Sequence, residues 1–459
     1  MYQIDFHNPI QIYFIGIGGI SMSGLAEILL SEGFKVSGSD RTPSDLTRML
    51  EERGVRVFYG QREENLTAAI DLVVYTAAIK GDNPELLAAK KLGIPTLTRA
   101  ELLGQMMKNY KMPIAISGTH GKTTTTSMLS TILLSADTDP TLSIGGIYKP
   151  IGGNIRVGAS DIFVTEACEY TNSFLSFFPK IGVILNIEED HLDFFKDLAD
   201  IRNSFRRFAE LLPADGTLII NGGIKDYQEI TENLPCRVIT YGFSPDFDYN
   251  VSDITFDESG CPAFLLKEKN GSDRRFSLRV HGEHNILNAV AAIAVADRLQ
   301  LSNKDIDEGL SSFGGTDRRF EYKGQMSGVN IIDDYAHHPT EIRATLNAAA
   351  QYPHKRLWCV FQPHTYTRTK AFLDEFAKAL SLADEIVLAD IYAAREKDTL
   401  GISSQTLQEK IRSLGHSCYY FPSFEAIEKF LSENCTKDDL LITMGAGDVV
   451  KIGETLLHK

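Results

Sequence analysis

A glycine-rich segment carries the residue types that bind and transfer phosphate. The segment GTHGKTT at 118–124 follows an apolar run at 113–117 and precedes a helical pattern. Such a turn directs backbone N–H groups toward an anion, while lysine adds a positive charge and a threonine hydroxyl can bind Mg²⁺. The loop is shorter than usual because Ile116 stands where a first glycine is expected, and an ordinary Thr-capped turn is the alternative. The candidate phosphate-binding residues are Gly118, Thr119, His120, Gly121, Lys122, Thr123 and Thr124.

Acidic and imidazole side chains follow the next predicted strands. Glu166 and Glu169 follow one of them, and Asp190 and His191 follow another. Ligands of open α/β sheets bind at the carboxyl ends of the strands, so these groups are candidates for holding Mg²⁺ beside the phosphates. Imidazole is an unusual Mg²⁺ ligand, and a capping or packing role is the alternative for His191.

A third motif, HNILN at 284–288, opens a predicted helix. Asn285 and Asn288 are three residues apart and therefore share one helix face. Their amides can donate to and accept from the edge of a nucleotide base. Simple N-capping by Asn285 is the alternative.

A second glycine cluster, at 16–24, also joins a predicted strand to a predicted helix. It favours a phosphate or diphosphate at the helix N-terminus, and Asp40 stands where dinucleotide folds carry a ribose-binding acid. Ser21 replaces the third glycine of that pattern. An NAD-dependent oxidoreductase is a competing hypothesis, but it leaves the segment at 118–124 unexplained. Two phosphate-binding turns predict two phosphorylated ligands, ATP and a nucleotide-linked substrate.

Polar segments follow predicted strands in the last third of the chain as well. DDYAHHP at 333–339 and QPHTYTR at 362–368 each come after an apolar run, and 390–396 and 445–448 follow later ones. Together they predict a polar surface at the strand ends that closes on substrate and nucleotide. Solvated loop polarity is the alternative for any single residue among them.

These segments need parallel sheets to position them. Strand-like runs alternate with helical patterns along the chain, which predicts an α/β fold built from doubly wound units. The expected domains are 1–108, 109–318 and 319–459. Alternation between 249 and 280, with the turn signal Asn270-Gly271, predicts a small antiparallel insertion in the second domain.

Composition narrows the class of protein. Of the 459 residues, 43% are hydrophobic and 23% are charged, as in ordinary globular proteins. The net charge of −15 disfavours nucleic acid as a partner. The lack of a long apolar run and of a signal-like N-terminus predicts a cytoplasmic protein without membrane insertion. Six scattered cysteines predict reduced thiols and no zinc site.

Taken together, the motifs resemble those of the Mur ligases, in order and over nearly the whole chain. DDYAHHP and HTYTRT are more specific than the phosphate loop, which folylpolyglutamate synthases share. The resemblance implies Rossmann-like N-terminal and C-terminal domains around a central P-loop ATPase domain. The motifs that carry it are GTHGKTT, EACEY at 166–170, NIEEDH at 186–191, HNxxN, Arg318-Arg319-Phe320, DDYAHHP and PHTYTRT.

The resemblance also implies an activity in peptidoglycan precursor synthesis, and hence in cell-wall biogenesis, cell shape and cell division. The motifs are most similar to those of members that join L-alanine to the carboxylate of UDP-N-acetylmuramate through an acyl phosphate, with release of ADP and phosphate. A sibling ligase that recycles a murein tripeptide onto the same sugar nucleotide is the nearest alternative, and a non-catalytic nucleotide sensor is another. Monomer and homodimer are both compatible with the sequence.

Residue roles follow from the resemblance position by position. ATP would contact the phosphate loop, Asn285, Asn288, Arg319 and Asp334. Mg²⁺ would be held by Thr123 and Glu166, and a second Mg²⁺ by His191. The residues implied in catalysis are Lys122, His191, His284, Arg319 and His337. Those implied in binding the UDP substrate are Gly16, Gly18, Gly19, Ser21, Met22, Ser39, Asp40, Thr76 and Ala77.

The amino-acid pocket is where the sequence departs most from the family pattern. His337 and Arg368 are implied in binding the amino acid, but Thr365 stands where an arginine is common. Cys168 stands where an aspartate is usual, which removes one possible anion near the metal. Arg368 is therefore expected to be the main cation for the amino-acid carboxylate.

Overall fold

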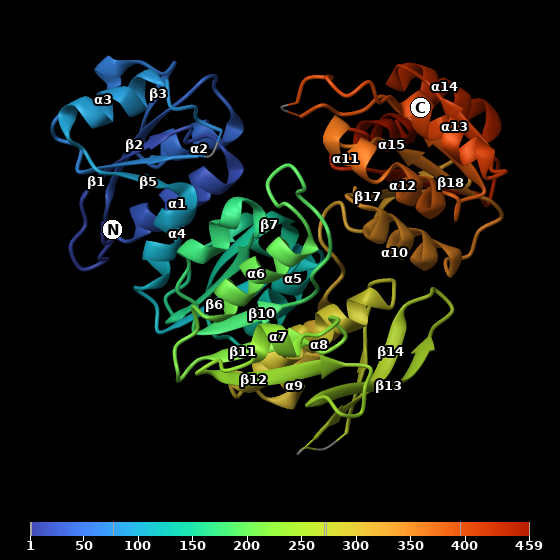
Figure 1. The fold of residues 1–459 in the computed structure, drawn as a ribbon, viewed down its shortest axis with the longest axis horizontal. Helices are drawn as coiled ribbons and strands as arrows, with labels where there is room; N and C mark the ends of the chain where they lie inside the picture. Colours follow the sequence, from blue (N-terminus) through green and yellow to red (C-terminus); the bar gives the residue numbers. More distant parts are fainter. Residues whose placement is uncertain (1, 77, 270, 272, 395, 459) are drawn as a thin grey trace.

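The chain folds around three separate β-sheets. The structure is a computed structural model that describes residues 2–76, 78–269, 271, 273–394 and 396–458. Each sheet with its helices is called a domain below. Figure 1 shows the N-terminal domain in blue and the C-terminal domain in orange and red, above a central domain in teal, green and yellow. The three-sheet α/β architecture agrees with the sequence prediction.

The N-terminal sheet is parallel throughout, with strand order β3-β2-β1-β4-β5. Its order reverses at β1, so the glycine turn after β1 lies where α/β sheets bind ligands. The strands are β1 (Gln11–Ile15), β2 (Lys35–Asp40), β3 (Arg56–Tyr59), β4 (Leu72–Tyr75) and β5 (Thr96–Thr98). The helices are α1 (Ile20–Ser31), α2 (Asp45–Glu52), η1 (Glu63–Asn65), α3 (Pro84–Leu92) and α4 (Arg99–Met107).

The central sheet has the order β15-β14-β13-β12-β11-β10-β6-β9-β7-β8 and is antiparallel at both ends. Its strands are β6 (Met112–Ser117), β7 (Thr141–Tyr148), β8 (Gly153–Arg156), β9 (Ile162–Ala167), β10 (Ile181–Ile184), β11 (Thr217–Asn221), β12 (Arg237–Gly242), β13 (Tyr249–Phe256), β14 (Pro262–Glu268) and β15 (Arg274–Ser277). Its helices are α5 (Lys122–Ser135), η2 (Lys149–Ile151), η3 (Tyr170–Ser176), α6 (Leu198–Ala209), α7 (Gln228–Thr231), α8 (His284–Arg298) and α9 (Asn303–Ser312).

The C-terminal sheet has the order β16-β17-β21-β18-β19-β20, and its first pair alone is antiparallel. Its strands are β16 (Glu321–Met326), β17 (Val329–Asp334), β18 (Leu357–Phe361), β19 (Glu385–Leu388), β20 (Cys418–Tyr420) and β21 (Leu440–Met444). Its helices are α10 (Pro339–Ala350), α11 (Tyr366–Ala371), α12 (Leu373–Leu380), α13 (Ser404–Ser413), α14 (Phe424–Asn434) and α15 (Val450–Leu457).

The N-terminal and central domains share a hydrophobic core, whereas the C-terminal domain has hydrophobic cores of its own. One cluster contains Leu103 and Met106 of α4 together with Phe163 and Phe174 of the central domain. None of the hydrophobic clusters formed by the described residues combines residues on both sides of position 318. Since polar interfaces permit domain movement, the C-terminal domain is the part best suited to open and close.

Helix α1 begins at Ile20, inside the glycine cluster at 16–24, and Gly19 is its N-cap. The hairpin of β7 and β8 was not predicted, since its glycine-rich sequence does not read as a strand. The antiparallel insertion at 249–280 is confirmed by β13, β14 and β15. Its predicted turn residue Asn270 lies outside the described residues.

Candidate functional site

The phosphate loop joins β6 to α5, as the sequence predicts. Gly118 and Gly121 have φ of 143° and 84°, which a residue with a side chain rarely adopts. Asn186, just beyond β10, accepts a hydrogen bond from the His120 N–H at 2.7 Å and donates one to the His120 carbonyl at 3.0 Å. Asn186 had no predicted role, although its two hydrogen bonds hold the loop in shape.

Lys122 is the first residue of α5, and its ammonium turns back over the loop. Its Nζ lies 2.9 Å from a carboxylate oxygen of Glu169 and also donates to the carbonyls of Gly118 and Thr119. Burial lowers the pKa of Lys122, but the Glu169 carboxylate outweighs it and raises that pKa. The lysine is therefore charged and positioned beside the predicted phosphate site.

Thr123 and Glu166 form the oxygen-rich part of the site. The Thr123 hydroxyl donates to Glu166 at 3.0 Å, and the Gly145 N–H of the β7–β8 hairpin donates to the other Glu166 oxygen at 2.5 Å. Burial raises the pKa of Glu166. These contacts place a hydroxyl and a carboxylate together at the start of α5.

His191 lies on the other side of Glu169. Its Nε2 is 3.9 Å from Glu169 Oε1, and its ring stacks on Tyr170 with centroids 4.5 Å apart. Glu169 Oε1 is buried and has no hydrogen-bond partner. An unpartnered buried carboxylate oxygen facing an imidazole is a place that a cation would satisfy. Glu169 thus contacts the Lys122 ammonium through Oε2 and faces His191 through Oε1.

A cavity of about 730 Å³ opens beside the phosphate loop. Asn285 and Asn288 lie in its wall, and a side chain at Gly121 would come within 2.6 Å of Asn288 Oδ1. Apolar side chains, among them Tyr241 and Phe313, complete the wall. A pocket with apolar surfaces and amides next to a phosphate loop suits a nucleotide base. The predicted residues that line it are His120, Gly121, Thr124, His284, Asn285, Asn288, Arg319 and Asp334.

Two ionisable groups in this cavity have shifted pKa values. Burial raises the pKa of Asp334 to about 6, against the charge of Arg319 and two backbone N–H donors. The His284 side chain is exposed on the side of the cavity. The protein atoms packed around it and the charge of Arg319 nonetheless lower its pKa to about 4. His284 is thus a neutral hydrogen-bonding group at neutral pH.

The amino-acid residues implied by the sequence meet between the central and C-terminal domains. Arg368 of α11 contacts Asp190 at 2.7 Å and His364 at 3.1 Å. The His337 and His364 rings are 5.8 Å apart. Burial lowers the pKa of His337 to about 4. His337, His364 and Arg368 therefore form one polar cluster at this domain contact, and Asp190 belongs to it as well.

The glycine turn of the N-terminal domain forms a separate feature. Asp40 accepts the N–H of Gly18 at 2.8 Å, and a side chain at Gly16 would come within 3.2 Å of Thr76. The Ser39 hydroxyl points elsewhere and donates to Glu85, so Ser39 supports the turn through its carbonyl. Ala77 lies outside the described residues. Gly19, Ser21 and Met22 begin α1 at this turn.

Several residues at the domain contact were not predicted. Glu341 of α10 contacts His120 at 3.1 Å, Glu188 accepts the hydroxyl of Thr340 at 2.5 Å, and His338 contacts the Glu189 carbonyl at 2.9 Å. The spacing of His338 and Glu341 is that of a capping box, which was the available signal for Glu341.

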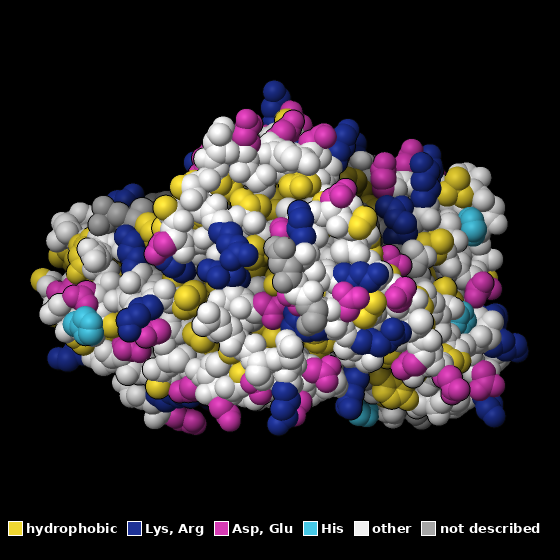
Figure 2. Space-filling view, turned by 90° about the horizontal axis from the view of Figure 1, so that it is seen from below, with side chains coloured by type: hydrophobic (Ala, Val, Ile, Leu, Met, Phe, Trp, Pro, Cys, Tyr) yellow, Lys and Arg dark blue, Asp and Glu magenta, His cyan; other side chains and the backbone are white. Residues whose placement is uncertain are grey.

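The molecular surface is mixed in charge. On the face drawn in Figure 2, Lys and Arg side chains stand among Asp and Glu side chains, and no continuous field of one sign covers it. In the described part of the chain, no helix has the length and apolar character needed to cross a bilayer.

Comparisons with known proteins cover the whole chain. Residues 11–111 match the Mur ligase family catalytic domain, 116–296 the Mur ligase middle domain, and 318–447 the Mur ligase glutamate ligase domain. The UDP-N-acetylmuramate–L-alanine ligases of Agathobacter rectalis and Lachnospira eligens are each 61% identical to the chain over 459 residues, covering all of both proteins.

Solved structures of related ligases also match the chain over nearly its whole length, at lower sequence identity. The UDP-N-acetylmuramate–alanine ligase of Thermotoga maritima is 29% identical, with a TM-score of 0.81 and 98% of each chain covered. The murein peptide ligase of Psychrobacter arcticus is 26% identical, with a TM-score of 0.71 and the same coverage.

Proposed function

The chain belongs to the Mur ligase family, and on that premise we propose that it joins L-alanine to UDP-N-acetylmuramate at the expense of ATP. The observation that carries the substrate assignment is the 61% identity to full-length relatives named for this reaction. The products are UDP-N-acetylmuramoyl-L-alanine, ADP and phosphate. This is a step in peptidoglycan precursor synthesis.

ATP binds in the cavity beside the phosphate loop. Asn285 and Asn288 hold the adenine, the loop N–H groups and Lys122 hold the β- and γ-phosphates, and Arg319 reaches the phosphates from its place in the cavity wall. Asp334 lines the same cavity. Lys122 is already charged and held over the loop by Glu169, and it stabilises the transferring phosphoryl group once one of its three present contacts is exchanged for a phosphate oxygen.

The residues also fit Mg²⁺. Thr123 and Glu166 would hold one ion, and His191, with the unpartnered oxygen of Glu169 beside it, would hold a second. Bound Mg²⁺ would screen the repulsion between a phosphate donor and a carboxylate acceptor. The pKa of Glu166 is raised by burial, so a cation there favours its ionised form.

The substrate carboxylate takes the γ-phosphoryl group and becomes an acyl phosphate. The amine of L-alanine attacks the acyl carbon, and the tetrahedral intermediate expels phosphate. Arg368 binds the alanine carboxylate, and the neutral imidazole of His337 orients the incoming amino acid. His284, which is neutral and faces the cavity, lies toward the reacting carboxylate.

Each domain contributes one part of this reaction. The N-terminal domain, 1–108, binds the UDP moiety at Gly16, Gly18 and the residues around Asp40. The central domain, 109–318, binds ATP. The C-terminal domain, 319–459, closes over ATP and the amino acid. We place the protein in the cytoplasm, where these soluble precursors are made.

Phosphate release tests the proposal directly. The protein is given ATP, Mg²⁺ and UDP-N-acetylmuramate, and each amino acid is offered in turn. Release that requires both the sugar nucleotide and L-alanine supports the proposed reaction. Release with a murein tripeptide but with no single amino acid would identify the recycling sibling instead, and nucleotide binding without release would identify a sensor.

A further inference from the structure

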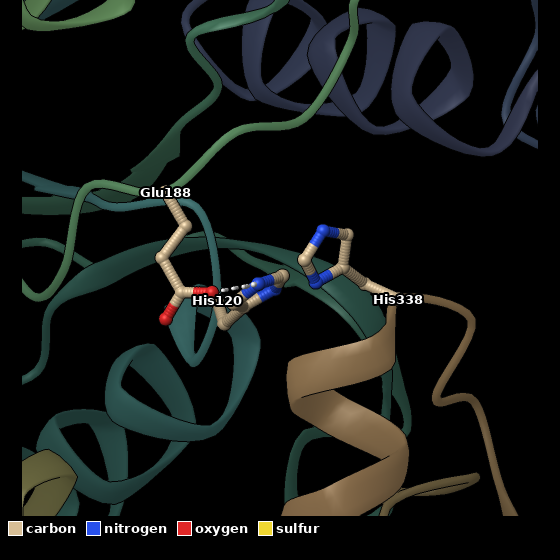
Figure 3. Close-up of side chains that lie close together, drawn as sticks. All are labelled: His120, Glu188 and His338. Carbon is tan, nitrogen blue, oxygen red and sulfur yellow. Dashed lines mark ion pairs between the residues drawn. The ribbon is translucent and has the colours of Figure 1, made fainter. Parts of the chain in front are cut away.

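Three side chains of metal-binding type meet where the phosphate loop faces the C-terminal domain. His120 belongs to the loop, Glu188 follows β10, and His338 is the N-cap of α10. One donor atom of each lies within 4.8 Å of the other two. Figure 3 shows the two imidazole rings facing each other with the Glu188 carboxylate beside His120. None of the three is an Mg²⁺ ligand in the proposed function.

The hydrogen bonds of His120 leave one nitrogen directed into this cluster. Its Nδ1 lies 3.1 Å from the carboxylate of Glu341, so Nδ1 carries a hydrogen. Its Nε2 is buried, has no hydrogen-bond partner and lies 3.7 Å from Glu188. A nitrogen lone pair facing a carboxylate is repulsive, and a positive charge between them, either a metal ion or a proton on His120, removes that repulsion. In the absence of a metal that charge is a proton on His120.

His338 is held in a related way, although its second nitrogen already accepts the N-cap hydrogen bond of α10. Its Nε2 lies 2.9 Å from the carbonyl oxygen of Glu189, which can only accept, so Nε2 carries the hydrogen. Its Nδ1 keeps a lone pair that receives only the long contact of 3.3 Å from the Thr340 N–H. Metal-bound histidines typically donate their second nitrogen to a carboxylate or a carbonyl in this manner. Both imidazoles are thus held in the tautomers that a metal ion requires.

We propose that His120, Glu188 and His338 form a binding site for Zn²⁺ or a similar transition-metal ion. Two imidazoles and one carboxylate suit Zn²⁺, whereas Mg²⁺ prefers oxygen ligands. Tetrahedral Zn²⁺ with these donors needs ligand atoms about 3.4 Å apart, so the cluster contracts by roughly 1 Å on binding. The cysteine pattern predicted no zinc site, and this one uses no cysteine.

The position of the site gives it a consequence for domain movement. His120 and Glu188 belong to the central domain and His338 to the C-terminal domain. The bound ion ties the two domains together and favours the closed arrangement over the open one. Since His120 is part of the phosphate loop, the ion also restrains that loop. Zn²⁺ therefore acts as a clamp that stabilises the closed arrangement.

Zn²⁺ titration of the full-length protein tests the site without any substrate. Metal is removed with a chelator, and Zn²⁺ is added in competition with a chromophoric indicator. One tightly bound ion per chain is expected, and Glu188→Gln and His338→Gln should each weaken binding at least about tenfold. His416→Gln, which changes an exposed histidine on the C-terminal domain, is the matched control and should bind as the unmodified protein does.

Co²⁺ gives a second readout. Bound at this site, it should show the visible absorption of a low-coordinate nitrogen-ligated ion, and the band should be lost in Glu188→Gln. Glu188→Gln keeps an acceptor for the Thr340 hydroxyl. It therefore tests the site even if His338→Gln, which loses the N-cap of α10, folds poorly. Equal Zn²⁺ affinity in the unmodified protein and Glu188→Gln, or no tight binding at all, would overturn the proposal and leave a protonated His120 between two carboxylates. Neither result depends on the ligase reaction.

Discussion

The guanidinium of Arg368 is bound by the carboxylate of Asp190, with Nη2 and Nε at 2.7 and 3.2 Å from Oδ1. The two residues lie 178 positions apart and come from different domains, and neither side chain is more than 10% exposed. Burial raises the pKa of Asp190, but the charge of Arg368 outweighs it and holds that pKa well below its ordinary value. An internal carboxylate thus occupies the cation that we assign to the carboxylate of alanine.

Arg368→Ala should mainly raise the KM for alanine. Loss of a buried charge-assisted contact costs about 2–5 kcal/mol, so an increase of at least about 30-fold is expected. Steady-state phosphate release at varied alanine measures it. The KM for alanine of Arg368→Lys should lie between that of the unmodified protein and that of Arg368→Ala, because an ammonium keeps the charge but cannot reproduce the guanidinium fork. An unchanged KM for alanine would remove Arg368 from the amino-acid pocket.

Lys122→Ala should abolish turnover while leaving the UDP substrate bound. Removing one preorganised positive group at a transferring phosphoryl lowers kcat by about 10²–10³ or more. The rate comes from phosphate release and the affinity for UDP-N-acetylmuramate from calorimetry. Lys149→Ala, which changes a lysine that lies in the same cavity but contacts Asp317 and Glu321, is the control. Parallel loss of sugar-nucleotide binding would argue against separate sites for the two ligands.

Glu166→Gln should raise the Mg²⁺ concentration needed for half-maximal activity. The amide keeps the shape and can still accept from Thr123, but it lacks the negative charge that attracts a divalent cation. Titration with Mg²⁺ at saturating substrates measures the shift, which we expect to be about tenfold or more. The same Mg²⁺ dependence in variant and unmodified protein would exclude Glu166 as a ligand.

His337 should make folding stability depend on pH. Its pKa is lowered to about 4 in the folded protein, so the unfolded chain binds its proton first as the pH falls. The contribution of His337 is complete above about pH 6.5 and is lost between about pH 6.5 and pH 4. At pH 5 the stability lost in this way amounts to about 2 kcal/mol. Urea unfolding at pH 7 and pH 5 should show a smaller loss in His337→Gln; an equal loss would mean that the imidazole titrates normally.

Gly104→Ala should destabilise the protein although Gly104 lies within helix α4. Alanine favours a helix by about 0.5–1 kcal/mol, but its Cβ would lie 1.9 Å from the Ser176 carbonyl oxygen. Overpacking costs about 1–3 kcal/mol, so a lower melting temperature is expected. Gly81→Ala is the control, because a side chain there meets nothing within 4 Å. A melting temperature for Gly104→Ala equal to that of the control would show that α4 can shift away from η3.

The sequence by itself determined the chemistry and its order along the chain. Strand–turn–helix signals are local, and a lysine or asparagine placed just after a strand must lie at a sheet's carboxyl edge. For this reason the place of Lys122 could be predicted from a single sequence, whereas Asn285 and Asn288 were singled out by their shared helix face. The glycine-rich β7–β8 hairpin was missed, because its pairing is set by the neighbouring strand β9 and not by its own residues.

Only the tertiary structure decided which charged groups meet. The contacts of Lys122 with Glu169, of Arg368 with Asp190, and of His120 with Glu341 join residues that no local pattern relates. Lys122 and Glu169 meet because β6 and β9 are neighbours in the central sheet. The other two pairs depend on how whole domains dock, and docking is set by many weak contacts summed over a surface rather than by residue spacing. The same reason explains why Glu188 and His338 had no predicted role, although each lies within a motif that the sequence analysis singled out.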